Sequence, residues 1–144
     1  MALKNYRSES TRSFEIIQQT LATHKAKQVV LDYADDGRVN ALAFSLEIEG
    51  RLHAFRLPAR VENVERILYG DRELTSAQKE QAYRTAWANL RDWITAQMAL
   101  IDTGMVKPEE VFLPYMLNRQ GQTYFEALQE NHFLLPSGEE GTRQ

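Results

Sequence analysis

Residues 29–57 read VVLDYADDGRVNALAFSLEIEGRLHAFRL, and this stretch decides the fold. Its first five positions are mostly β-branched or aromatic, as in a strand. Asp35-Asp36-Gly37 and Glu49-Gly50-Arg51 are turn signals, because glycine accepts the positive φ that a tight hairpin requires. Between the turns, apolar residues alternate with small or polar ones from Leu42 to Ile48, the period of a strand with one buried face. The stretch therefore predicts a three-stranded antiparallel meander that ends at Pro58.

Helical spacing replaces this period on both sides of the meander. Before it, Phe14, Ile17 and Leu21 predict a first helix over residues 11–24, and Lys25 follows where a positive charge complements the helix dipole. After it, the clearest apolar seam predicts one long helix over residues 76–103.

Start and stop signals bound the other elements. Thr75 with Gln78, and Thr123 with Glu126, are spaced as capping boxes that begin helices. A helix from Val61 is closed by Gly70, and a short helix begins at Pro108 and is broken at Pro114. Residues 4–8 are a candidate for a short additional strand.

The order of these elements favours an α+β fold, with an N-terminal helix packed on a three- to four-stranded antiparallel meander. A helical C-terminal half with one long helix follows. We expect one domain over residues 1–136, with the helix and sheet in 1–58 and the helical part in 59–136. Residues 133–136 are expected to pack the chain end onto the body, and the small, polar residues 137–144 to form a disordered tail.

The composition excludes several classes of protein. The 144 residues include 17 Lys and Arg and 20 Asp and Glu, a formal net charge of −3 that does not favour a dedicated nucleic-acid binder. The absence of Cys rules out a disulfide scaffold, a thiolate zinc site and a cysteine nucleophile. No apolar run approaches the ~20 residues of a membrane helix. Because residues 1–10 lack the apolar core of a secretion signal, we expect a cytoplasmic protein.

The polar residues indicate no catalytic or metal site. His24, His53 and His132 do not have the spacing that places two ligands on one helix face. The acidic run before Gly37 fails the calcium-loop pattern, because Ala43 occupies the position that requires Glu. Glycine-rich phosphate loops and nucleophile elbows are absent from the sequence. We therefore expect that the protein is not an enzyme and binds no metal or cofactor. The alternative hypothesis is an unrecognised hydrolase with a polar pocket around His53.

Arginines in and beside the predicted strands are the first candidate binding residues. Together they would form a small phosphate-binding patch. The alternative is that they are solvated and paired with nearby glutamates. These arginines are Arg38, Arg51, Arg56 and Arg60.

The long helix supplies the other candidates, Arg84, Arg91 and Trp93. Trp93 lies beside the apolar seam rather than in its centre. A partly exposed Trp next to Arg is typical of a protein–protein hot spot. The alternative is that Trp93 widens the stripe that faces the core.

Three pieces of sequence carry a resemblance to known proteins. They are Phe55-Arg56-Leu57-Pro58-Ala59, Ala96-Gln97-Met98-Ala99-Leu100-Ile101 and Val111-Phe112-Leu113-Pro114-Tyr115-Met116. Over residues 4–135 the chain resembles a group of small uncharacterised proteins encoded by bacteriophages, prophages and other mobile elements. The resemblance implies a cytoplasmic protein of a bacterial host cell, in the company of replication, recombination or anti-defence genes. It assigns no catalytic residue.

Together these observations predict a non-catalytic phage or mobile-element accessory protein that binds a macromolecular partner. A protein of the bacterial host is the expected partner, and inhibition of a host defence nuclease, as by an anti-CRISPR protein, is one form of this function. The alternative is a nucleic-acid-binding accessory of phage replication or recombination. The seam of the long helix also permits a homodimer.

Overall fold

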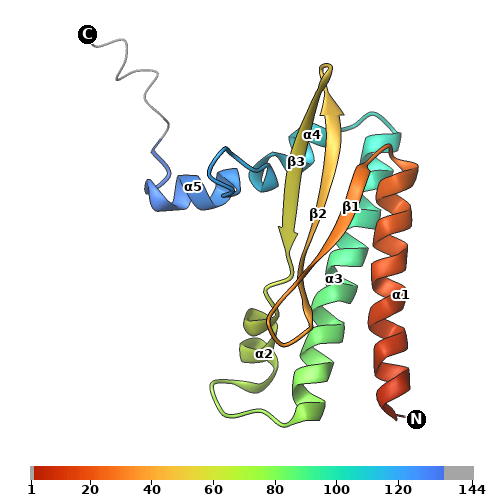
Figure 1. The fold of residues 1–144 in the computed structure, drawn as a ribbon, viewed down its shortest axis with the longest axis vertical. Helices are drawn as coiled ribbons and strands as arrows, with labels where there is room; N and C mark the ends of the chain where they lie inside the picture. Colours follow the sequence, from red (N-terminus) through yellow and green to blue (C-terminus); the bar gives the residue numbers. More distant parts are fainter. Residues whose placement is uncertain (1, 135–144) are drawn as a thin grey trace.

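The computed structural model describes residues 2–134, and its architecture is α+β (Figure 1). One helix precedes a three-stranded sheet, and a long helix with several short ones follows it. In chain order the elements are α1 (Ala2–Thr23), β1 (Lys27–Tyr33), β2 (Val39–Ile48), β3 (Arg51–Pro58), α2 (Val61–Tyr69), α3 (Ser76–Asp102), α4 (Pro108–Phe112), the 3₁₀ turn η1 (Leu113–Tyr115) and α5 (Tyr124–Glu130).

The sheet is the predicted antiparallel meander, with strand order β1-β2-β3. The β2–β3 ladder is regular from Ala41 opposite Pro58 to Ile48 opposite Arg51. The β1–β2 ladder shifts register between Lys27 and Val30, where Gln28 has a φ of 56°. An extra residue with left-handed backbone is typical of a β-bulge.

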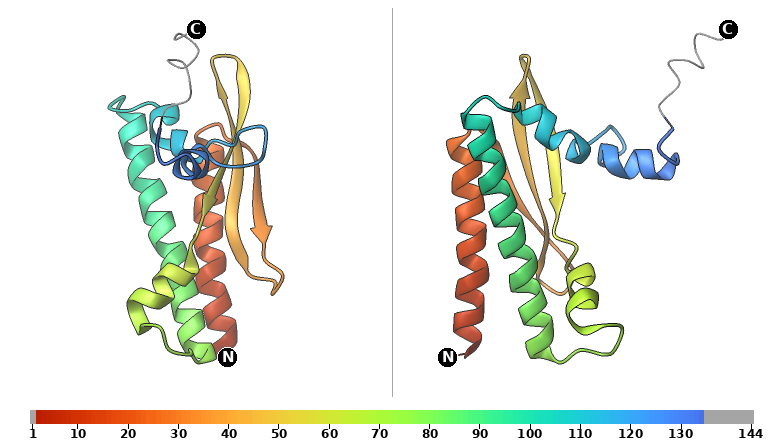
Figure 2. Two further views of the ribbon diagram at one scale, coloured as in Figure 1. Left: turned by 90° about the vertical axis from the view of Figure 1, so that its left-hand side faces the viewer. Right: turned by 180° about the vertical axis from the view of Figure 1, so that it is seen from behind.

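The helices and the sheet form two layers (Figure 2). α1 and α3 lie side by side and run in the same direction, so their C-terminal ends lie at the same end of the molecule (Figure 1). Both cover one face of the sheet, and α2 packs against the start of α3. α5 lies to one side, away from the two long helices (Figure 1).

The core lies between the two layers. Phe44 and Phe55, directly opposite on β2 and β3, stack with their ring centroids 5.3 Å apart, and Phe112 of α4 meets both rings edge-on. Two side chains of α3 also hold the start of β2. Val39 N donates to the Tyr83 hydroxyl over 2.9 Å, and Trp87 Nε1 donates to the Val39 carbonyl over 3.2 Å. The sheet and the long helix are therefore joined by both packing and buried hydrogen bonds.

The helix boundaries confirm the predicted start and stop signals. Both capping boxes form, at Thr75 before α3 and at Thr123 before α5. Pro108 is the first residue of α4, and the backbone becomes 3₁₀ around Pro114. Gly70 ends α2 with a φ of 79°, as a C-terminal glycine does.

The prediction for residues 4–8 was wrong, because they belong to α1 rather than to a strand. The segment contains no β-branched residue, so nothing in it favoured a strand over an N-terminal extension of the helix. The sheet of the described residues therefore has three strands and not four.

The expected packing of the chain end was also wrong for the two residues that are described, Phe133 and Leu134. Both are exposed, and the Phe133 ring lies 5.9 Å from that of Phe125 in α5 rather than against the sheet. The sequence pattern could not show that α5 lies to one side of the helix and sheet layers, so that the residues after it do not pack on the sheet. Leu135, Pro136 and the predicted tail 137–144 lie outside the described residues.

No helix in the described part of the chain combines the length and apolarity needed to cross a membrane.

Candidate functional site

The structure does not bring the four strand arginines into one patch. Arg38 precedes the first residue of β2, whereas Arg51 faces its last residue, Ile48, so the two lie at opposite ends of a ten-residue strand. Arg56 and Arg51 are five positions apart on β3 and therefore point to opposite faces of the sheet. Arg60 is the N-cap of α2, and its guanidinium lies 5.7 Å from the centre of the Phe125 ring.

Arg38 is occupied by contacts within the protein. Its guanidinium lies 4.3 Å from the centre of the Tyr83 ring, and Nη2 donates to the carbonyl of Lys79 over 3.1 Å. Burial, the largest cause, raises the pKa of the Tyr83 hydroxyl, while the hydrogen bond from Val39 and the charge of Arg38 lower it. These contacts of Arg38 hold the β1–β2 turn against the first turns of α3.

The candidates on α3 also point in different directions. Arg91 donates to Asp92 over 3.0 Å and to Ser13 of α1 over 3.4 Å, and Arg84 donates to Gln81. Trp93 is half-buried, and its ring lies 5.9 Å from both Phe112 and Tyr115. Trp93 therefore packs on the α4 side of the helix, whereas Arg91 contacts α1.

One face of the sheet is not covered by the helix layer. In Figure 1 the sheet lies in front of α3, and its uncovered face is turned to the viewer. Directly opposed residues of neighbouring strands share a face, so the ladder identifies the residues on this side. We call this surface the open sheet face and define it by Val30, Asp32, Ala43, Leu52, Ala54 and Arg56.

The open sheet face combines exposed apolar side chains with one ion pair. Val30 and Leu52 are each 54% exposed, and alanines lie between them on β2 and β3. Arg56 Nε lies 3.2 Å from Oδ2 of Asp32, which spans from β3 to β1 across the small side chains of β2. The ladder also places the exposed carboxylate of Glu47 on this face, directly opposite Leu52, so the face combines small and apolar side chains with an ion pair and one further negative charge.

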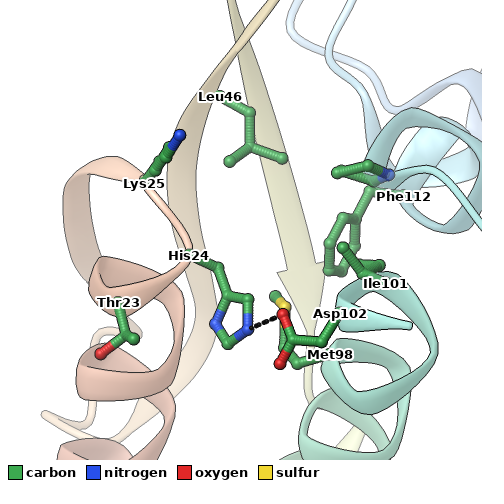
Figure 3. Close-up of a pocket in the computed structure, with 9 residues that line it drawn as sticks. Thr23, His24, Lys25, Leu46, Met98, Ile101, Asp102 and Phe112 are labelled. Atoms are coloured by element: carbon green, nitrogen blue, oxygen red, sulfur yellow. Dashed lines mark hydrogen bonds and ion pairs between the residues drawn. The ribbon is translucent and has the colours of Figure 1, made fainter. Parts of the chain in front are cut away.

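A pocket lies at the end of the molecule where α1 and α3 terminate (Figure 3). It has a volume of about 300 Å³, and we call it the His24 pocket. Figure 3 shows His24 and Lys25 on one side, Ile101 and Phe112 on the other, and Leu46 of β2 between them. Its lining comprises Thr23, His24, Lys25, Leu46, Met98, Ile101, Asp102, Pro108 and Phe112.

His24 connects the two helix ends through both of its ring nitrogens. Nδ1 lies 2.7 Å from the carbonyl oxygen of Thr20, and Nε2 lies 2.9 Å from Oδ1 of Asp102. Both neighbours are acceptors, so only the doubly protonated imidazolium can donate to both. The hydrogen bond to Thr20 is the largest cause that raises the pKa of His24, followed among the raising causes by Asp102, while burial lowers it. The carbonyl-rich C-terminal ends of two parallel helices also favour a cation here.

This arrangement limits what His24 can do chemically. Because each ring nitrogen already faces an acceptor, neither is directed at a molecule in the pocket, as a general acid or base must be. His53, the residue of the alternative hydrolase hypothesis, lies on β3 opposite Leu46 and does not line the His24 pocket. Among the described residues, no group of three His, Asp or Glu is placed to hold a metal ion.

Sequence reasoning missed the pairing of His24 with Asp102, because 78 positions separate them. No sequence motif near either residue signals the pairing. The structure shows an unusual helix end beside it, because Lys25, which follows α1, has a φ of 74°. Lys25 N donates to the carbonyl of Ala22, and Ala26 N donates to that of Leu21, the pair of bonds that defines a Schellman motif. This position is usually glycine, so the start of β1 is reached through an unusual helix end.

No known protein family, curated protein or solved structure matches this chain. The resemblance to phage and mobile-element proteins therefore stays a prediction. The arguments that follow depend on the geometry of the open sheet face and the His24 pocket.

Proposed function

We propose that the chain is a non-catalytic binding protein that engages a protein partner through the open sheet face. The observation that carries this proposal is the exposure of Val30 and Leu52 on a face that the helix layer leaves uncovered. Small side chains (Ala43, Ser45 and Ala54) separate the two, so a partner that covers both removes their apolar area from water.

The charges of this face favour a protein over a nucleic acid as the partner. The guanidinium of Arg56 is paired with Asp32, so its charge is already neutralised within the sheet. A surface for nucleic acid carries unpaired cations that replace the counterions of several phosphates. A face that mixes exposed apolar side chains with an internal ion pair and the carboxylate of Glu47 resembles a protein–protein interface instead.

The resemblance to phage and mobile-element proteins supports a partner from a bacterial host. In its most specific form, the proposal is that the chain inhibits a host defence nuclease by covering part of its surface. An inhibitor of this kind needs a rigid docking surface and no catalytic group.

The test compares capture of partners by charge-substituted variants. Tagged wild-type protein is incubated with bacterial lysate, with and without nuclease treatment, beside the double variant Val30→Glu/Leu52→Glu and the control Ile67→Glu. Ile67 is 85% exposed on α2, away from the sheet, so the control adds charge at an apolar residue outside the proposed surface.

We expect one stoichiometric protein with the wild type and with the control, and at least a tenfold lower yield with the double variant, about 1.4 kcal/mol of binding free energy. Circular dichroism checks that all three proteins are folded. Equal capture by the double variant, or proteins that disappear after nuclease treatment, would reject the open sheet face as a protein-binding surface. The second result would support the nucleic-acid alternative.

A further inference from the structure

We propose that the His24 pocket binds a small amphipathic monoanion, a single carboxylate carried on a short apolar chain or ring. This site is separate from the open sheet face, because it lies on the helix side of the sheet, where α1 and α3 end. Its volume of about 300 Å³ is at the lower end of the range for small-molecule sites.

The floor of the pocket is apolar. Leu46, Met98 and Phe112 are core residues whose surfaces reach the pocket from β2, α3 and α4, and Ile101 completes the wall (Figure 3). Because these three side chains are already almost fully buried, a ligand with an apolar body would displace water chiefly from the less buried Ile101 and Pro108 of the lining. Three elements that the core already fixes in place supply the floor, so the site is preformed.

The charges on the rim select the head group. Asp102 is paired with His24, and both ring nitrogens of His24 are occupied. Lys25 also lines the pocket, and no ion pair joins its ammonium to a carboxylate within the described residues. The charge left to interact with a ligand is therefore the positive charge of Lys25.

The surroundings of the pocket limit the ligand to one negative charge. A wider groove adjoins the pocket and shares His24 and Lys25 with it, and its further charged residues are Lys27, Glu47 and Glu109. Within the pocket itself Lys25 is the one lysine or arginine of the lining, so a single anionic group matches its charge, and the mixed charges of the groove offer a second anionic group no net attraction. A short monoanion stays beside Lys25 with its apolar part on the floor.

The backbone at Lys25 is an independent observation in favour of a role for its side chain. Lys25 holds the left-handed conformation that glycine adopts without steric cost. The conformation follows from its place after α1, and a lysine rather than a glycine at this position puts a long side chain at the rim of the pocket. The Schellman bonds fix the backbone of Lys25 at the rim of the pocket.

The test is an NMR titration of the full-length protein with sodium octanoate, with octylammonium as the matched cationic probe. The variants are Lys25→Gly, which removes the cation and suits the backbone, and the control Lys79→Gln, which removes an exposed cation from the opposite end of α3. Lys25→Gly is expected to relieve strain, and the dispersion of its NMR signals checks that the variant is folded.

We expect octanoate to shift the amide and methyl signals of Leu46, Met98 and Ile101 with saturation, and octylammonium to leave them unchanged. Lys25→Gly should raise the dissociation constant at least about fivefold, and Lys79→Gln should not change it. Shifts spread over other surfaces, equal effects of both probes, or unchanged affinity in Lys25→Gly would each overturn the proposal. None of these results depends on whether the open sheet face binds a protein.

Discussion

The imidazole of His24 joins the C-terminal ends of two parallel helices, because its Nε2 lies 2.9 Å from Oδ1 of Asp102 while its Nδ1 faces the Thr20 carbonyl. The contact is the direct link between the last turn of α1 and the last residue of α3. It also makes the stability of this end of the molecule depend on pH.

We predict that His24→Gln lowers the free energy of unfolding at pH 5.5 and has a smaller effect at pH 8.5. The pKa of His24 is raised above its ordinary 6.5 in the folded protein. Its stabilising contribution is therefore complete below the unfolded pKa and is lost as the pH rises through the folded one. The expected loss at pH 5.5 is about 0.5–1 kcal/mol, the usual size of a charge at a helix end.

Urea denaturation of both proteins at the two pH values measures this difference. The charged groups around His24 are Asp102 on α3, Lys25 on the same turn, and Glu47 and Glu109 at the adjoining groove. All of them remain in the variant, so their titration largely cancels. If His24→Gln lowers the free energy of unfolding equally at both pH values, His24 acts through packing and not through its charge.

Lys25→Gly is predicted to stabilise the fold. The lysine has a φ of 74° and a left-handed backbone costs an L-residue about 1–2 kcal/mol, which the greater freedom of glycine in the unfolded chain partly offsets. A net gain of about 0.5–1 kcal/mol in the free energy of unfolding is expected. Lys27→Gly is the control, since Lys27 is an exposed residue of β1 where glycine should destabilise. A loss of stability in Lys25→Gly would mean that the lysine side chain holds the helix end.

Thr75→Ala should destabilise the protein by about 1 kcal/mol, because the Thr75 hydroxyl accepts from Gln78 N at the start of α3. Thr95→Ala is the matched control inside the same helix. The Thr95 hydroxyl donates to the Arg91 carbonyl inside the helix and caps no helix end. Thr95→Ala should therefore change the stability little. Thermal denaturation of both variants tests the difference, and equal effects would contradict the capping argument.

Local chemistry explains which parts of the fold the sequence could predict. The strands, the capping boxes and the helix ends at Gly70 and Pro108 each depend on neighbours within about four residues. Residues 4–8 were mispredicted because the segment contains no β-branched residue that favours a strand, and it continues α1 toward the N-terminus.

The candidate sites depend on distant residues, and most of them could not be predicted. Of the open sheet face only Arg56 was among the predicted binding residues, and its pairing with Asp32 requires the register of two ladders. The four arginines were grouped by their place in the sequence, but strand length and alternation separate them. His24 and Asp102 meet only because α1 and α3 run in parallel and end at the same level.

Phe112→Ala is predicted to be the most damaging of the substitutions considered, with a loss of about 3–5 kcal/mol in the free energy of unfolding. Phe112 is fully buried, meets Phe44 and Phe55 edge-on and contacts Trp93, so its removal leaves a cavity between α4 and the sheet. Its neighbour Leu113 is 46% exposed, and Leu113→Ala should cost well under 1 kcal/mol. Urea denaturation with tryptophan fluorescence follows both variants, because Trp93 lies beside the site. A small effect of Phe112→Ala would mean that α4 is not part of the cooperative core, and the floor of the His24 pocket would then lack its fixed wall.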